Sequence, residues 1–260
     1  MEMAAEWLAA SEAGALRPPG DVHDAAGWDS YWRAHIRVGP LEQGFSDMMS
    51  SDPELPALLL DRSVRTILCV GNGLSAEAFS LALCGFEVTA LDISAVPAEL
   101  IADQWRHPEH PLHTIPGFTI DEENVVRFTD SGPIETEHGS RMHRGNVNMY
   151  RGGGSLKSVI GDLVNAAVCP GPFDVVIERR TLQLFPPEER IHGLERLVAR
   201  LASRGMFVSQ QHSGGWRPGQ PRTHYAQEWL RSAGFVMRSH ADGAEANSAP
   251  RLASLTFSTG

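Results

Sequence analysis

Apolar residues occur along the chain in short runs that end in glycine or acidic residues, a pattern typical of strands alternating with helices. The clearest example opens at residues 66–70, TILCV, an apolar run rich in β-branched residues. A glycine turn and a helix-like stretch at 76–83 follow, with Gly85 as the expected helix cap. A second apolar run, 88–91, ends at Asp92. Strands that are apolar throughout are typical of sheets covered on both faces, so this stretch predicts part of such a sheet.

The same alternation continues in the second half of the chain. Five further strands are predicted, at residues 158–163, 173–177, 205–211, 235–240 and 252–258. A helix with one apolar face begins at Pro187, between the second and third of these strands. The last two strands are joined by a polar loop too short for a crossover helix, so we expect them to run antiparallel. The pattern therefore predicts an α/β sheet of seven strands, with helices on both faces and an antiparallel last strand.

One connection is much longer than a sheet of this kind requires. Asp162 follows Asp92 by 70 positions, whereas a crossover between parallel strands needs on the order of a dozen residues plus its strands. Residues 106–155 are therefore predicted to be an insertion, with a candidate hairpin at 118–129 around a polar turn. We expect a single domain over residues 1–260 that carries this insertion.

An aromatic cluster precedes the first strand of the sheet. Trp28, Tyr31 and Trp32 are spaced at i, i+3 and i+4, so they would share one face of a helix. Such a face can pack on the sheet or cover a ligand bound at its edge, and the sequence leaves both interpretations open. Residues 1–60 form an N-terminal segment that we expect to be helical.

Composition narrows the classes of function. A hydrophobic content of 42% in 260 residues is enough for one full core, and no apolar run approaches the length of a membrane span. The net charge of −10 argues against nucleic acid and anionic membranes as partners. Cys69, Cys84 and Cys169 lie among apolar residues, and residues 1–10 contain no basic side chain. These features predict a cytoplasmic protein with reduced thiols and no secretory signal.

Candidate chemistry gathers where predicted strands end. Gly71 and Gly73 would let the backbone turn sharply and approach a ligand with no Cβ in the way. The N–H groups that open the next helix would attract a polar or anionic group. Asp92 ends the following strand, where a carboxylate can accept two hydrogen bonds from a ribose diol. Together these residues predict a nucleoside site.

This stretch resembles motif I of the class I S-adenosylmethionine-dependent methyltransferases, in which an apolar strand, a glycine turn, a helix and an acid-terminated strand follow one another. Two positions depart from the motif, because Cys69 stands where the family has an acid and Ser75 where it has a third glycine. Residues 173–179, FDVVIER, resemble the family's motif IV. The glycine turn, continued to Ala76, also matches a variant of the dinucleotide-binding fingerprint.

The resemblance implies a Rossmann-like sheet and transfer of the methyl group of S-adenosylmethionine to a small-molecule nucleophile, mainly by proximity and alignment. It implies that the aromatic helix is a lid over the cofactor. The implied cofactor-binding residues are Val70, Gly71, Asn72, Gly73, Asp92, Ile93, Asp162, Leu163, Glu178, Trp28, Tyr31 and Trp32. The candidate residues for acceptor chemistry are His212, on a loop at the ligand side of the sheet, Glu178, His143 and Tyr150.

Two other functions stay open. A nicotinamide-dependent oxidoreductase would need a tyrosine–lysine pair or its equivalent, and no tyrosine here has a lysine four residues on. A non-catalytic nucleoside-binding protein is compatible with the two departures from motif I. Histidines at positions 107, 110 and 113 have a spacing that could suit a metal, but intervening prolines break any helix there, so we predict no metal site. The sequence indicates neither the acceptor nor the oligomeric state.

Overall fold

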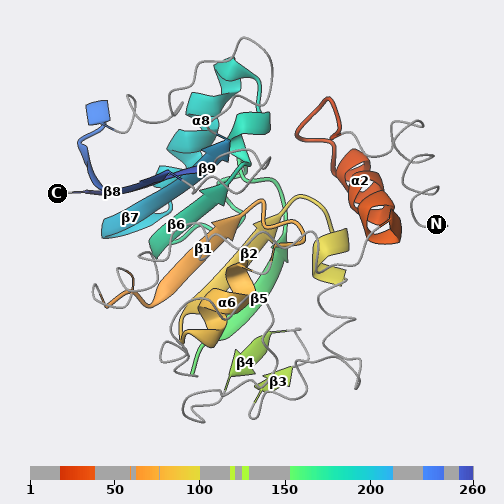
Figure 1. Cartoon of the computed structure of the whole chain (residues 1–260), viewed down its shortest axis with the longest axis horizontal. Helices are drawn as coiled ribbons and strands as arrows, with labels where there is room; N and C mark the ends of the chain where they lie inside the picture. The colour runs from red at the N-terminus through yellow and green to blue at the C-terminus, as the bar shows by residue number, and fades with distance from the viewer. Residues whose placement is uncertain are drawn as a thin grey trace.

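The computed structural model describes residues 18–38, 59, 63–75, 77–99, 118–120, 125–128, 153–212, 231–242 and 252–259. The strands are β1 (Thr66–Val70), β2 (Glu87–Asp92), β3 (Phe118–Ile120), β4 (Val126–Phe128), β5 (Ser155–Ile160), β6 (Phe173–Arg179), β7 (Leu201–His212), β8 (Phe235–Asp242) and β9 (Leu252–Thr259). The helices are α2 (Ala25–Val38), α6 (Glu77–Leu83) and α8 (Pro187–Val198), with a short 3₁₀ helix, η4 (Leu182–Leu184). The strands form one sheet in the order β3-β4-β5-β2-β1-β6-β7-β9-β8 (Figure 1).

The centre of the sheet consists of five parallel strands, β5, β2, β1, β6 and β7. β1 lies in the middle, and its last residue, Val70, is level with Leu91 of β2 and Glu178 of β6. Parallel strands end at the same edge of a sheet, so the residues that follow β5, β2, β1 and β6 gather along one carboxyl edge. α2 lies beyond this edge (Figure 1).

The outer strands are antiparallel to their neighbours. β3 and β4 form the hairpin predicted in the insertion, and β4 pairs antiparallel with β5. At the opposite edge, β9 pairs antiparallel with both β7 and β8. The sequence predicts seven strands and the described sheet has nine, because the hairpin joins the sheet instead of standing apart from it.

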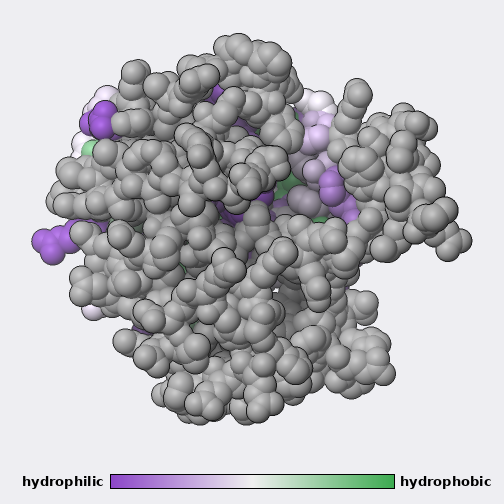
Figure 2. Space-filling view, viewed as in Figure 1, coloured by the Kyte–Doolittle hydropathy of each residue, from purple (hydrophilic) through white to green (hydrophobic). Residues whose placement is uncertain are grey.

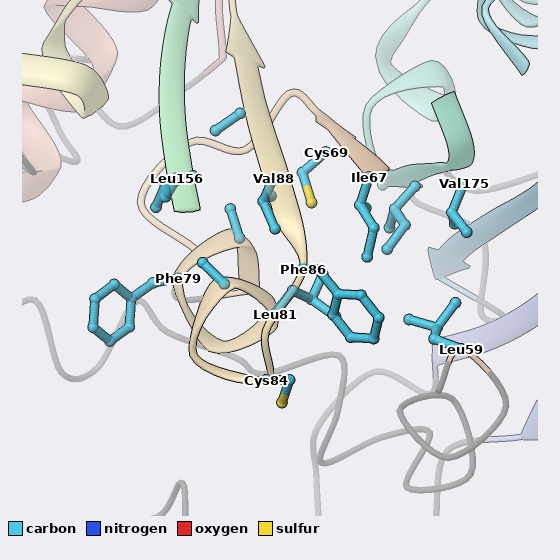
Figure 3. Packing of buried hydrophobic residues seen from close by; sticks show 14 of the residues in the cluster. Leu59, Ile67, Cys69, Phe79, Leu81, Cys84, Phe86, Val88, Leu156 and Val175 are labelled. Carbon is cyan, nitrogen blue, oxygen red and sulfur yellow. The ribbon is translucent and has the colours of Figure 1, made fainter. Parts of the chain in front are cut away.

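Alternate residues of the central strands enter two hydrophobic clusters, one on each face of the sheet. Ile67 and Cys69 of β1 lie in the cluster that contains α6, seen in Figure 3 with Leu81 packed among the strand residues. Leu68 and Val70 lie in the other cluster, which contains Leu194 and Leu197 of α8. This alternation explains the continuous apolar runs in the sequence, because strands buried on both faces have no solvent-facing side.

Two strand boundaries differ from those predicted. β5 begins at Ser155 and ends at Ile160, so Asp162 follows the strand instead of lying in it. A side chain at Gly154 would meet the carbonyl oxygen of Ala82 in α6, and this tight contact precedes the pairing of β5 with β2. β7 begins at Leu201, before the predicted start of this strand at 205. Leu201 pairs with Phe173 at the start of β6.

Several predictions fall outside the described residues. They include most of the N-terminal segment expected to be helical at 1–60 and most of the insertion at 106–155. Among the helices that are described, none has both the length and the apolar character needed to cross a bilayer.

Candidate functional site

The turn after β1 depends on two glycines with left-handed backbone angles. Gly71 has φ of +59° and Gly73 has φ of +49°, backbone angles that residues other than glycine rarely adopt. A Cβ at Gly71 would meet the hydroxyl of Thr181, and a Cβ at Gly73 would lie 2.6 Å from the Trp32 ring. The turn therefore needs glycine for its conformation, and also because Thr181, which follows β6, and α2 approach it closely.

Asp92 joins the end of β2 to this turn. One carboxylate oxygen, Oδ2, accepts a hydrogen bond from the Gly73 N–H at 2.8 Å, and Oδ1 accepts one from the Ser94 N–H at 2.9 Å. Burial raises the pKa of the Asp92 carboxyl to about 6, although these N–H donors favour the charged form. Each oxygen retains a lone pair, so the carboxylate can accept further hydrogen bonds from a ligand.

The aromatic face of α2 is divided between the domain core and the glycine turn. Trp28 is buried, and its indole N–H donates to the Val22 carbonyl at 3.1 Å. Trp32 stacks beside Trp28 with ring centroids 6.2 Å apart, and its ring lies against Gly73. Tyr31 packs edge-on against both tryptophans. In the space-filling view, hydrophobic and hydrophilic residues lie side by side between α2 and the rest of the domain (Figure 2).

α2 and the turn before it are attached to the carboxyl edge by polar contacts. Asp29 accepts hydrogen bonds from the Ser94 hydroxyl at 2.5 Å and from the Ala95 N–H at 3.0 Å. Val96 then begins a helical stretch. Asp29 therefore fixes α2 next to the residues that follow β2. Farther along α2, Arg33 lies 3.2 Å from Glu99 in an exposed ion pair.

His23 makes the second attachment, at the end of β5. Its Nδ1 lies 2.6 Å from Asp162 Oδ2 and its Nε2 lies 3.3 Å from Glu189 Oε2 at the start of α8. Burial opposes protonation, but the hydrogen bonds to the two carboxylates outweigh it, so the pKa of His23 is raised. Asp162 Oδ1 also accepts the Val164 N–H at 3.0 Å, and neighbouring Leu163 is buried. No pattern in the sequence pointed to His23.

Glu178 is a candidate both for cofactor binding and for acceptor chemistry. Its side chain is fully buried, with 0% exposure, at the end of β6. It accepts hydrogen bonds from the Ser209 hydroxyl, from the Thr181 N–H at 3.2 Å and from the Leu182 N–H at 3.3 Å. Thr181 in turn donates its hydroxyl proton to the Val70 carbonyl at 3.0 Å. Glu178 thus holds the turn that packs against Gly71.

Arginine residues follow Glu178 at the same strand end. Arg179 is buried, and its Nε donates to Gln210 Oε1 at 2.7 Å. Arg180 has φ of +57°, an unusual angle for a residue with a side chain. Burial and the charge of Arg179 together lower the pKa of Arg180 to about 10. Burial raises the pKa of the nearby Tyr31 hydroxyl, while the charge of Arg180 opposes that rise.

The other candidates for acceptor chemistry are His143, Tyr150 and His212. His143 and Tyr150 lie outside the described residues, and of His212 only the backbone is described, at the end of β7. The histidines at positions 107, 110 and 113 also lie outside them. Within the described part of the chain, no three His, Cys, Asp or Glu side chains are grouped as a metal would need.

No protein-family model and no curated protein matches this sequence. Solved structures do resemble it. A magnesium protoporphyrin IX methyltransferase from Synechocystis PCC 6803, with bound S-adenosylmethionine, is 17% identical, with 88% of this chain and 84% of that chain covered at a TM-score of 0.50. A Burkholderia thailandensis 1,6-didemethyltoxoflavin-N1-methyltransferase, with bound 1,6-didemethyltoxoflavin and S-adenosylhomocysteine, is 15% identical. The match covers 81% of this chain and 78% of that chain at a TM-score of 0.50. An S-adenosylmethionine-dependent methyltransferase from Methanosarcina mazei is 12% identical, with 77% of this chain and 96% of that chain covered at a TM-score of 0.51.

The chain has an α/β Rossmann-like methyltransferase fold. Its five parallel strands form the centre of that fold, with the residues described above along their carboxyl edge. Because the identities are 12–17%, the likeness extends to the fold alone.

Proposed function

We propose that this protein is an enzyme that transfers a methyl group from S-adenosylmethionine to a small-molecule nucleophile. The observation that carries the proposal is the order of groups along the carboxyl edge. Asp162 follows β5, Asp92 ends β2, the glycine turn follows β1 and Arg179 ends β6, and these strands are neighbours in that order. When bound, S-adenosylmethionine supplies an activated methyl group for in-line displacement, so the main tasks of the chain are to bind and to align.

The proposed contacts to the adenosyl group use the carboxylates of the edge. Asp92 accepts hydrogen bonds from the ribose diol, supported by the lone pairs that its oxygens retain beside the Gly73 and Ser94 N–H groups. Asp162 accepts a hydrogen bond from the adenine amine, next to apolar Leu163. The remaining proposed cofactor contacts are Val70, Gly71, Asn72, Ile93, Trp28, Tyr31 and Trp32.

Two buried polar atoms beside the glycine turn support a polar ligand there. Among the described residues, the indole Nε1 of Trp32 and Oδ1 of Asn72 have no hydrogen-bond partner. An unsatisfied buried polar group costs about 1–3 kcal/mol, which a ligand with matching donors and acceptors would offset. The Trp32 ring lies against Gly73, so we propose that α2 is a lid that must shift when the cofactor enters or leaves.

The finer architecture also belongs to this proposal. We propose one domain over residues 1–260, in which residues 1–60 are the lid segment, residues 106–155 are an insertion and β9 is the reversed last strand of the methyltransferase sheet. Its antiparallel pairing with β7 supports the last of these assignments. We place the enzyme in the cytoplasm, supported by three cysteines that are all free, two of them buried.

Acceptor chemistry is proposed for His212, His143 and Tyr150. A general base is required only if the acceptor loses a proton near the transition state. For Glu178 we propose a positioning role, because the carboxylate already accepts three hydrogen bonds from the protein. It would hold the turn that carries Thr181 against the glycine turn.

Ligand-dependent thermal unfolding of the full chain tests the proposal. A ligand at 100 times its dissociation constant stabilises a protein by about 2.7 kcal/mol, which is readily measured as a shift in Tm. We expect S-adenosylhomocysteine to raise Tm, and NAD(H) and NADP(H) to leave it unchanged. Asp92→Ala should reduce the shift. Stabilisation by a nicotinamide dinucleotide instead, or by none of these ligands, would contradict the proposal.

A further inference from the structure

The glycine motif lacks its usual acid at Cys69, and another carboxylate lies close to that position. Cys69 is buried in β1, and burial together with the negative charge of Glu77 raises the pKa of its thiol well above the ordinary value. Glu77 is the first residue of α6, and its side chain has only 3% exposure. A buried carboxylate therefore lies beside the end of β1, although it comes from the helix and not from the strand.

Two guanidinium groups accompany this carboxylate. Nη1 of Arg179 lies 3.8 Å from Glu77 Oε1 and donates to the Ser75 hydroxyl at 3.3 Å. The same hydroxyl accepts the Glu77 N–H at 3.3 Å, so Ser75 links both side chains to the glycine turn. Arg180 is close enough for the charge of Glu77 to favour its protonated form. The end of β6 and the start of α6 thus bring charges of both signs together in a site from which most water is excluded.

The strand order places Arg179 and Arg180 at the end of β6, three strands from β5, which Asp162 follows. A nucleoside held by Asp92 at the end of β2 would extend over the glycine turn after β1 and reach the end of β6. β2 and β6 are two strand spacings apart, about 10 Å. An amino-acid tail attached to the ribose has a comparable length. The tail of such a cofactor carries an ammonium and a carboxylate, and Glu77 and Arg180 offer the complementary charges.

We propose that Glu77 and Arg180 bind the amino-acid end of the cofactor, with Glu77 accepting from the ammonium group and Arg180 donating to the carboxylate. Arg179 positions Glu77 and is itself held by Gln210. Glu77 thereby replaces the acid that motif I lacks at Cys69. This inference rests on the proposed function. It deepens that function by making the site selective for ligands that retain the amino acid, since charge-assisted hydrogen bonds are the strong ones.

Calorimetric titration of the full chain with two ligands tests the inference. S-adenosylhomocysteine carries the amino-acid end, and 5′-methylthioadenosine retains the nucleoside without it. We expect wild type to bind S-adenosylhomocysteine at least 10-fold more tightly. Glu77→Gln and Arg180→Gln should each weaken S-adenosylhomocysteine by about 10- to 100-fold and leave 5′-methylthioadenosine unchanged, because hydrogen bonds to charged groups contribute about 1.5–3 kcal/mol each.

Arg65→Gln is the matched control. Arg65 is exposed and pairs with Glu87 where β1 and β2 begin, at the edge of the sheet opposite the proposed site. Its loss should therefore change neither affinity. Equal weakening of both ligands by the Glu77 and Arg180 variants would mean that these residues only support the turn, and would overturn the inference. Equal affinity of wild type for the two ligands would overturn it without any variant. If wild type bound neither ligand, the proposed function itself would fall.

Discussion

The two ends of the carboxyl edge are built in different ways. At the β5–β2 end, His23 and Asp29 attach α2 and its preceding turn through contacts that are partly open to solvent, and the His23 side chain is 33% exposed. At the β6 end, the charged groups are inside the domain, with 8% exposure for Arg179 and 0% for Glu178. Both ends contain charged side chains, so charge alone does not distinguish them. The difference lies in how much water each charge has lost.

Desolvation decides what a substitution at each end should do. A buried charge that loses its partners has no water to replace them, so its loss affects the fold. An exposed contact can be replaced by water at little cost, so its loss affects mainly the position of α2 and the binding of ligand. We therefore expect stability to depend mainly on Glu178 at the β6 end, and ligand affinity to depend on Asp92 as well as on the proposed contacts of Glu77 and Arg180.

The largest effect is expected at Glu178. Glu178→Ala would leave the N–H groups of Thr181 and Leu182 and the Ser209 hydroxyl without their acceptor in a fully buried position. We expect the free energy of unfolding to fall by about 3–5 kcal/mol, measured by denaturant titration with circular dichroism. Glu178→Gln, which keeps one acceptor oxygen, should cost less. A loss below about 1 kcal/mol for the alanine variant would mean that the two ends of the edge do not differ in their contribution to stability.

The next effect concerns affinity and not stability. Asp92→Ala should weaken S-adenosylhomocysteine by about 1.5–3 kcal/mol, or roughly 10- to 150-fold, because the diol acceptor is removed. The apo protein should lose little stability, since burial already disfavours the charged Asp92 and offsets the two lost hydrogen bonds. Calorimetry and urea unfolding of the same variant would separate these quantities. Unchanged affinity would remove Asp92 from the site.

The same contrast explains what the sequence could predict. The glycine turn and Asp92 could be placed because the turn geometry and the strand end depend on residues close together in the chain. The roles of residues at the β6 end could not be predicted, because Glu178 accepts a hydrogen bond from Ser209 on the next strand. Nor does any periodicity connect His23 with Asp162, which are 139 positions apart. The start of β5 was misplaced because its register is set by pairing with β2 and not by the local apolar run.

The pKa of Asp92 predicts a pH dependence with opposite signs for stability and binding. Because the pKa is raised from 3.8 to about 6, this group stabilises the fold fully below pH 3.8, and that contribution is lost as the pH rises through 6. The ionised carboxylate is the better diol acceptor, so ligand affinity should rise over the same interval. We expect S-adenosylhomocysteine to bind about 10-fold more weakly at pH 5 than at pH 7.

Asp92→Asn is the control for this pH profile. The asparagine keeps the size of the side chain but does not titrate, so the part of the profile due to Asp92 should become flat. Calorimetric titration at half-unit intervals of pH would measure it. A variant whose affinity still fell 10-fold would assign the titration to another group.

The smallest effect is expected at His23. Its partners are Asp162 and Glu189, with the charge of Asp21 also nearby, and its contacts are partly exposed, so His23→Gln should cost less than about 1 kcal/mol. Because the pKa of His23 is raised above 6.5, its contribution is fully present below that pH and is lost as the pH rises through the folded-state value. Urea unfolding should therefore separate His23→Gln from wild type at pH 6 but not at pH 9.

His192→Gln on α8, whose exposed side chain lies 3.8 Å from Glu195, is the matched control and should show no such difference. A cost for His23→Gln that was equal at both pH values would mean that the contact works by packing against Phe185, and that the β5 end resembles the β6 end more than its exposure indicates.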